Sequence, residues 1–320
     1  MKSFIISEND ANQRLDKFIT KSMPNLPNAL MYKYIRTKRI KVNKKRAQIS
    51  TRLCVGDVVD MYVNDEFFSV PNNNKDFLNA PKCLDIIYED DNIILLNKKV
   101  GLLCHPDENE YIDTLIARLK RYLYDNGKYN PDNELSFTPA LVNRIDRNTG
   151  GIVIAAKNAQ SLRILNEKMK NRELQKYYIC VVHGILEKKE DTLDGYLVKN
   201  EDKNKVFVYK SCQKNSKQIK TKYKVLDSYN NISLVEVELL TGRTHQIRAH
   251  FASIGHPLLG DGKYGTNLLN KKHGYKKQFL YSYKLVFNFT TDAQILQYLN
   301  HKEFLINDVW FKEEFLNRKL

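Results

Sequence analysis

The sequence predicts an α+β fold, in which a large domain with a central, largely antiparallel mixed sheet flanked by helices follows a small α+β domain. Short β-branched runs and helical patterns alternate irregularly along the chain, which is typical of this class. An Asn-rich stretch with two prolines, NDEFFSVPNNNKDFLNAPK at 64–82, interrupts the pattern. With 320 residues, of which 42% are hydrophobic, the chain is long enough for two buried cores. We therefore predict a small domain at 1–66, a linker at 67–82 and a large domain at 83–320.

The small domain is predicted to contain two helices and a few short strands. Leu15, Phe18 and Ile19 have helical spacing, Asn12 can cap the helix that carries them, and Pro24 ends it. A second helix is predicted to carry Leu30, Tyr34 and Ile35. Ile40 and Val42 are predicted to lie on the first strand of a hairpin that turns at Asn43-Lys44, and another strand is predicted over residues 58–63. These elements indicate a small, separate unit.

In the large domain the clearest strand is Gly151–Ala156 (GIVIAA), which is apolar and β-branched enough to be fully buried. Tyr177 and Tyr178 begin another strand, whose alternation sends one ring to each face. Further strands are predicted at 84–88, 93–96, 225–226 and 232–240, and helices from Asp113, around Leu162, Leu165 and Met169, and after Thr241-Gly242 with Ile247, Phe251 and Ile254 inward.

The charge of the chain favours a polyanionic partner. Lys and Arg number 52 against 37 Asp and Glu, which gives a formal net charge of +15. From Lys17 to Gly56 there are eleven Lys or Arg and no acidic residue. A solvated surface usually mixes both signs, so a run of one sign is better explained by a phosphate-binding surface. The candidate RNA-binding residues in this run are Lys33, Arg36, Lys38, Arg39, Lys41, Lys44, Lys45 and Arg46.

Several classes of protein are disfavoured by what the sequence lacks. The five cysteines are widely spaced and form no Cys-x-x-Cys pair, which argues against a disulfide scaffold and a structural zinc. No ligand cluster or dinucleotide fingerprint is present, so we expect no metal and no small-molecule cofactor. No run reaches the roughly 18 apolar residues of a membrane span, and Glu8 and Asp10 interrupt any apolar signal core. We expect a cytoplasmic protein that does not enter a membrane.

Three segments contain residues suited to chemistry. In LVNRIDRNTGGIVIAAKN (141–158), Asp146 precedes a tight turn and could project into a cleft, or could merely hydrogen-bond the amides of that turn. In LLTGRTHQIRAHFASIGHPLLGDGKYG (239–265), Arg243 falls in the first turn of the predicted helix, where a cation needs a nearby carboxylate to offset the helix dipole. Tyr178 lies in the third segment, RELQKYYICVVHG (172–184).

In this order the three segments resemble the RluA-type family of pseudouridine synthases. NRIDRNTGG is similar to the family's central motif, QKYYICVVHG to its K-x-Y element, and TGRTHQIRAHFASIGHPLLGD to its C-terminal motif. LNKKVGLLCHPDE at 96–108 is similar to the first motif, with Lys98 and Gly101-Leu102 kept. The departures from the family pattern are Asn143 for His, Ile145 for Leu, Gly150 for Ser and Lys99 for Pro. The small domain resembles the RNA-binding domain of ribosomal protein S-four through RLDKFI, IRTKRIKVN and VGDVV.

The resemblance implies an enzyme that isomerises uridine in RNA to pseudouridine. It assigns nucleophilic catalysis to Asp146, kept ionised by an opposed Arg243, and stacking on the target uracil to Tyr178. Arg144 matches the residue that replaces the flipped-out base. It also implies that the partner is RNA, and members with this small domain mostly act on large-subunit ribosomal RNA.

Other functions remain open from the sequence alone. The chain could be a non-catalytic RNA-binding factor in ribosome assembly, it could act on transfer RNA, or it could hydrolyse small substrates. The basic small domain argues against the hydrolase, because a small substrate does not need a phosphate-binding surface. We expect the protein to be a monomer.

Overall fold

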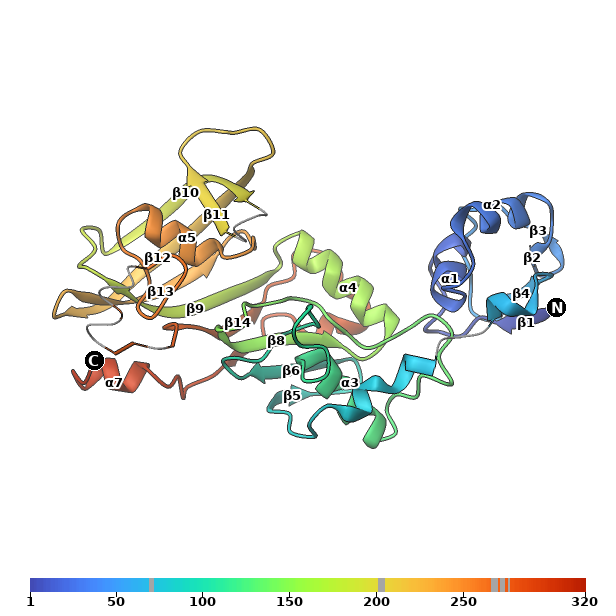
Figure 1. Ribbon diagram of the computed structural model, residues 1–320, viewed down its shortest axis with the longest axis horizontal. Coiled ribbons are helices and arrows are strands. Elements are labelled where there is room, and N and C mark those ends of the chain that lie inside the picture. The colour runs from blue at the N-terminus through green and yellow to red at the C-terminus, as the bar shows by residue number, and fades with distance from the viewer. Residues whose placement is uncertain (69–71, 201–204, 266–269, 271–273, 276) are drawn as a thin grey trace.

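The computed structural model describes residues 1–68, 72–200, 205–265, 270, 274–275 and 277–320. It contains a small domain at the N-terminal end of the molecule and a large domain built on an extended sheet (Figure 1). The predicted α+β class is confirmed. Within the described residues, no helix is long and apolar enough to cross a bilayer.

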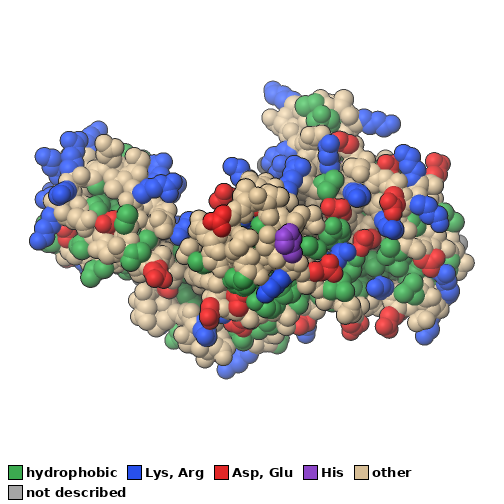
Figure 2. Space-filling model, turned by 180° about the vertical axis from the view of Figure 1, so that it is seen from behind, with side chains coloured by type: hydrophobic (Ala, Val, Ile, Leu, Met, Phe, Trp, Pro, Cys, Tyr) green, Lys and Arg blue, Asp and Glu red, His purple; other side chains and the backbone are tan. Residues whose placement is uncertain are grey.

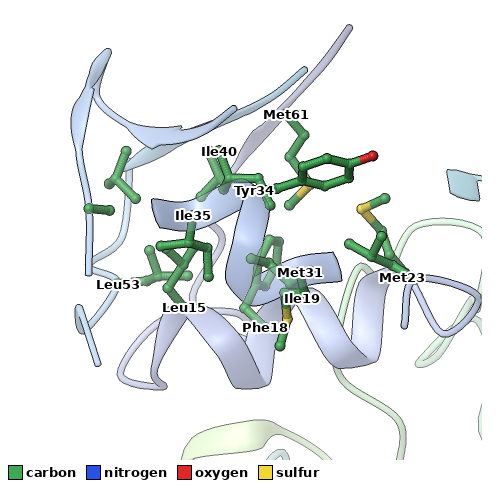
Figure 3. Packing of buried hydrophobic residues seen from close by; sticks show 14 of the residues in the cluster. Leu15, Phe18, Ile19, Met23, Met31, Tyr34, Ile35, Ile40, Leu53 and Met61 are labelled. Carbon is green, nitrogen blue, oxygen red and sulfur yellow. The ribbon is translucent and has the colours of Figure 1, made fainter. Parts of the chain in front are cut away.

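The small domain packs two helices against a four-stranded sheet of order β1-β4-β2-β3. Leu15, Phe18 and Ile19 are fully buried in its core, as their spacing predicts (Figure 3). The first helix begins after Arg14 rather than at Asn12, which instead has a left-handed backbone with φ of 59°. The elements are β1 (Lys2–Ile5), α1 (Leu15–Ser22), α2 (Asn28–Arg36), β2 (Ile40–Val42), β3 (Lys45–Arg46) and β4 (Val58–Met61).

The turn between β2 and β3 forms where the sequence predicts it. Asn43 and Lys44 both have positive φ, 51° and 63°, as a two-residue hairpin turn requires. Asn43 also ties this turn to β4, because its Oδ1 accepts a hydrogen bond from the amide of Val58 at 2.9 Å. The turn therefore presents its lysines outward from a fixed base.

The segment predicted as a linker is partly folded onto the large domain. It contains two short 3-10 helices, η1 (Asp65–Phe68) and η2 (Asn72–Asn79). Phe77 and Ala80 are buried against α3 (Leu115–Asp125) of the large domain. The second half of the segment thus extends the core of the large domain.

The large domain contains an eleven-stranded sheet of order β11-β10-β12-β13-β9-β14-β8-β6-β5, to which β7 and β15 add at β8 and β14. Of the described strand pairs, β14 and β8 run parallel and the others antiparallel. The strands are β5 (Ile86–Glu89), β6 (Ile93–Lys98), β7 (Ala140–Leu141), β8 (Gly150–Ala156), β9 (Leu174–His183), β10 (Glu190–Asn200), β11 (Lys205–Tyr209), β12 (Lys217–Tyr229), β13 (Ile232–Leu239), β14 (Leu280–Phe287) and β15 (Glu303–Leu305).

Helices cover both faces of this sheet. In β8, every residue of which is buried, Ile152 packs with α4 (Ala159–Lys170), whereas Val153 packs with α3. In β9, Tyr178 packs with α5 (Gln246–Ser253), whereas Tyr177 lies on the side of α7 (Lys312–Leu316). The prediction that the two tyrosines face opposite sides is confirmed. The remaining element is η3 (Gln294–Leu299).

Polar contacts join the two domains. Asp10 Oδ1 accepts a hydrogen bond from Ser136 Oγ at 2.6 Å, and that hydroxyl in turn accepts one from Gln13 at 2.7 Å. Arg163 on α4 donates to the carbonyl oxygen of Ala11 at 3.2 Å. Leu135 of the large domain also packs against the apolar core of the small domain, so the contact between the domains combines hydrogen bonds with an apolar contact.

Gly151 gives a test of how β8 meets β14. Its φ is 111°, and a Cβ added there would overlap the carbonyl oxygen of Ser282 in β14. We expect Gly151→Ala to lower the free energy of unfolding by about 3 kcal/mol, because it adds a backbone clash to the cost of an unfavourable φ. Urea denaturation measures the change.

Gly127→Ala is the matched control. Gly127 also has a positive φ, 66°, but a Cβ there would meet no atom within 4 Å. It should cost only about 1 kcal/mol, the cost of the left-handed backbone alone. Equal losses in the two variants would contradict the close approach of β8 and β14.

Candidate active site

A cleft of about 750 Å³ lies on the α5 side of the sheet. It is bounded by the loop after β6, the loop between β7 and β8, the middle of β9, and the loop that leads into α5. Asp146, Tyr178, Arg243 and Arg144 all line it. The cleft therefore brings together the four residues that the sequence singled out in three separate segments.

Asp146 lies in the loop between β7 and β8, just before the 147–148 turn. The backbone carbonyl of Asp146 closes this turn by accepting the amide of Thr149 at 3.1 Å. The carboxylate itself is turned away from these amides, since its described hydrogen-bond partner is Arg248. Asp146 thus points into the cleft and is not occupied in stabilising its own turn.

Lys98 fixes the backbone beside Asp146. Its ammonium is fully buried at the end of β6 and donates to the carbonyls of Lys99, Leu102 and Arg147 at 2.7–3.1 Å. Burial lowers the pKa of Lys98 to about 8, and Cys104 and Asp146 partly oppose this shift. The buried cation therefore ties the loop after β6 to the residue that follows Asp146.

Arg248, on the first turn of α5, is the arginine that pairs with Asp146. Its Nη1 donates to Asp146 Oδ2 at 2.8 Å. Its Nε and Nη2 donate to the two oxygens of Asp261 at 2.7 and 2.9 Å. One guanidinium thus bridges two carboxylates, a fork-like geometry that a lysine could not provide.

The prediction that Arg243 opposes Asp146 is wrong. The helix begins at Gln246, not after Gly242, so Arg243 lies in the preceding loop with an exposed side chain. Gln246 shapes that loop, because its Oε1 accepts from the Thr241 hydroxyl at 2.8 Å and the Arg243 amide at 3.1 Å. Ile254, predicted to face inward, is 39% exposed beyond the end of α5.

His245 also lies beside Asp146. Its Nδ1 is 2.9 Å from the Tyr264 hydroxyl, which accepts the amide of Val206 and so has its proton available for His245. The remaining Nε2–H then faces Asp146 Oδ2 at 3.8 Å. Burial lowers the pKa of His245, Asp146 opposes this shift and Arg248 adds to it, and because the pKa is lowered overall the ring is neutral at neutral pH.

Tyr178 forms part of the cleft wall on β9. The residue is only 6% exposed, and its ring packs in the cluster that includes Ile247 and Phe251 of α5. Burial raises the pKa of its hydroxyl, a shift that a hydrogen bond with Ser282 opposes and Asp146 reinforces. The hydroxyl is therefore protonated and the ring is held rigidly near Asp146.

Arg144 and Asn143 occupy the mouth of the cleft. Arg144 is exposed, and its charge lowers the pKa of His105 after the larger effect of burial. Asn143, one of the departures from the family pattern, accepts the amide of Ile154 on its Oδ1 at 2.8 Å. Asn143 therefore holds the loop against β8 and leaves Arg144 projecting outward.

The basic residues of the small domain form a separate surface. Seven of the eight candidates are exposed and Lys41 is half-buried; none forms an ion pair with a carboxylate in the part of the chain that the structure describes. Arg39 lies over the ring of Tyr34 and Lys41 over that of Tyr62. Figure 2 shows Lys and Arg side chains gathered over the outer side of this domain. The charges are free to meet an external anion.

The described residues contain no group of three or more His, Cys, Asp or Glu that could hold a metal ion. The site residues that the sequence missed are Arg248, Asp261, Lys98 and His245. Arg248, His245 and Asp261 all lie within the C-terminal motif, so their segment was identified while their roles were not. Only contacts between distant segments of the chain show that Arg248, and not Arg243, pairs with Asp146.

Comparison with known proteins matches both domains. Residues 92–253 match the family model described as RNA pseudouridylate synthase, and residues 13–59 match the S4 domain. An uncharacterized RNA pseudouridine synthase of Mycoplasma capricolum subsp. capricolum is 33% identical over 97% of this chain and 99% of its own. The ribosomal large subunit pseudouridine synthase C of Vibrio vulnificus is 31% identical over 91% of this chain and 90% of its own.

A solved structure shares part of the fold. Human RNA pseudouridylate synthase domain containing 4 is 21% identical, with a TM-score of 0.57, and covers 73% of this chain and 92% of its own. At this identity the likeness concerns the fold alone.

Asp261 provides a test of the arginine bridge. Asp261→Asn removes the buried charge that offsets Arg248, so we expect a loss of about 3 kcal/mol in the free energy of unfolding at neutral pH. Burial alone would raise the pKa of Asp261, but the Arg248 hydrogen bonds lower it overall. Its contribution is therefore present above the ordinary carboxyl range and lost below it, so the difference should shrink below about pH 4. Urea denaturation at several pH values measures both effects.

Asp308→Asn serves as the control, because Asp308 is exposed. It should change the stability by less than about 0.5 kcal/mol. If Asp261→Asn were as stable as this control, the bridge would not hold the site together.

Proposed function

Because the chain belongs to the family of RNA pseudouridylate synthases, we propose that it isomerises specific uridines of large-subunit ribosomal RNA, with Asp146 as the nucleophile. The observation that carries the proposal is the carboxylate of Asp146, aimed into a cleft and held by Arg248 at 2.8 Å. The large-subunit target is supported by the name of the Vibrio vulnificus relative and by the basic small domain.

The reaction breaks the bond between N1 of uracil and C1′ of ribose, turns the base, joins C5 to C1′, removes the C5 proton and leaves a proton on N1, so that no atom is gained or lost. A carboxylate can assist by attacking either C1′ of the sugar or C6 of the base. Both routes need an ionised carboxylate in a site from which the substrate excludes water. The pairing with Arg248 supplies the opposite charge that this requires.

The other cleft residues take roles around this acid. Tyr178, rigid and protonated, offers a ring against which the flipped uracil can stack, a contact worth about 1–3 kcal/mol in other nucleic-acid complexes. Arg144 at the mouth suits the vacancy that the extruded base leaves in the RNA. Arg248 takes the role first expected of Arg243.

Asp146→Asn tests the catalytic assignment. We expect pseudouridine formation on large-subunit ribosomal RNA to fall at least about 10³-fold, because the amide is not a nucleophile, while RNA binding persists. Pseudouridine mapping of total RNA from cells that lack the gene, complemented with each variant, measures the product. Asp308→Asn is the control and should restore the wild-type pattern.

The same map distinguishes the alternatives. Loss of pseudouridine from transfer RNA alone would replace the ribosomal target with a transfer RNA target. Full activity of Asp146→Asn would rule out Asp146 as the nucleophile. An unchanged map in cells without the gene would favour a non-catalytic RNA-binding factor.

The basic surface of the small domain predicts salt-dependent binding to the same RNA. We expect the double variant Lys38→Gln and Arg39→Gln to bind large-subunit ribosomal RNA more weakly and to reduce the slope of log K against log salt by roughly 0.7–0.9 per lost contact. Filter binding at several salt concentrations measures the slope. Substitution of Lys82 and Lys188, which already pair with Asp125 at 3.7 Å and Asp191 at 2.8 Å, is the control. An equal slope in both variants would place the RNA elsewhere.

A further inference from the structure

The wall of the cleft carries two cations that have no carboxylate partner among the described residues. Lys176 lies on β9 two residues before Tyr178, so both side chains leave the same face of the strand and line the cleft. Arg243 lies in the loop before α5. Gly242 directly precedes Arg243 and lies beside Lys176, since a Cβ built on it would be 3.6 Å from Lys176 Nζ. The two cations therefore arise from neighbouring positions on the wall.

Lys176 is half-buried, and its hydrogen-bond partner is weaker than those of the buried lysines of the large domain. Lys98 donates to three carbonyls, and Lys168 pairs with Glu173 at 2.9 Å. The described partner of Lys176 Nζ is Sδ of Met169 at 3.1 Å, and a thioether is a weak acceptor. Burial lowers the pKa of Lys176 to about 8. At neutral pH it remains a partly desolvated cation that an anion would stabilise.

The position of Lys176 points away from the reacting base. Tyr178 pairs with Ser282 of β14, the residue that meets Gly151 of β8 just after the turn that follows Asp146, whereas Lys176 pairs with Leu285 farther along β14. Lys176 therefore lies farther along the sheet from that turn than Tyr178 does, near Met169 at the end of α4. An anion bound there would belong to a part of the RNA next to the uracil rather than to the uracil itself.

We propose that Lys176 and Arg243 together bind a backbone phosphate next to the target uridine. This inference rests on the proposed function, since it takes RNA as the occupant of the cleft. A phosphodiester has two unesterified oxygens, so one can meet the compact ammonium and the other the planar guanidinium. Phosphate contacts fix the register of a nucleic acid on a protein. The pair would thus determine which nucleotide reaches Asp146.

Lys176→Met and Arg243→Met test the proposal on large-subunit ribosomal RNA transcribed in vitro. Each should raise KM about tenfold, the effect of losing one hydrogen bond to a charged group, and leave kcat nearly unchanged. Each should also reduce the slope of log K against log salt by roughly 0.7–0.9. Lys176→Arg keeps the charge and should keep the slope, which separates the charge from any effect of packing.

Lys319→Met is the matched control. Lys319 is exposed and follows α7, which packs through Phe315 on the opposite face of the sheet from Tyr178. Its KM and salt slope should equal those of the wild type.

Replacement of single phosphates by neutral methylphosphonates identifies the contact. In a short RNA spanning the modified uridine, one flanking methylphosphonate should weaken the wild type and leave Lys176→Met unaffected. If a methylphosphonate at every flanking position weakened binding of Lys176→Met as much as it weakened binding of the wild type, the proposal would be overturned. An unchanged KM in Lys176→Met and Arg243→Met, or a loss confined to kcat, would also overturn it. A wild-type enzyme that makes no pseudouridine would instead refute the proposed function.

Discussion

The cleft depends on one arginine held between two carboxylates. Arg248 is a buried cation in the first turn of a helix, where the helix dipole opposes it, so it needs compensating negative charge. Asp261 supplies that charge through two hydrogen bonds and is itself held by the amides of Lys263 and Tyr264. The third donor of the guanidinium is thereby aimed at Asp146. The order of the loop between β7 and β8 therefore depends on a contact made by Asp261, which lies far from this loop in the sequence.

The same arginine organises the neighbouring side chains. Its guanidinium lies over the ring of Tyr264, with 5.2 Å to the centroid. The hydroxyl of that tyrosine meets His245, whose Nε2 faces the same Asp146 oxygen, Oδ2, that Arg248 binds. On the backbone side, Lys98 holds the residue after Asp146 through its carbonyl. The carboxylate is thus constrained by charge from one direction and by main-chain geometry from another, and little reorganisation is needed when a substrate arrives.

Much of the fold could be predicted from the sequence because local pattern and final environment agree. The unbroken apolar run of β8, the alternation at Tyr177 and Tyr178, and the turn at Asn43 each record one periodicity or one backbone requirement. These features are set within a few residues of the chain. The place of Asp146 before a turn left its role open, and the resemblance of the whole motif to the family pattern assigned the catalytic role.

The choice between Arg243 and Arg248 could not be made locally. Both lie in one short motif, and helical periodicity allows a helix that starts at Gly242. What delays the helix is Gln246, whose side chain bonds the loop before it and reaches across to the carbonyl of Lys220 on β12 at 3.0 Å. Arg248 is the arginine that pairs with Asp146 because Asp261 holds its guanidinium in place. Asp261 lies in a loop that comes near Arg248 only when the chain is folded. Such decisions rest on contacts between distant segments, which no periodicity records.

The contact between the two domains has a consequence for how a target is found. Each domain has a hydrophobic cluster of its own, and the contacts of Asp10, Ala11 and Leu135 orient the small domain on the large one. RNA held by the small domain is then presented to the cleft at a high effective concentration, which falls steeply for any uridine at the wrong separation. The distance between the basic surface and Asp146 determines how far along the RNA a uridine must lie from the segment that the small domain binds. Two weak contacts with the RNA, one at the small domain and one at the cleft, can thus together select a single uridine.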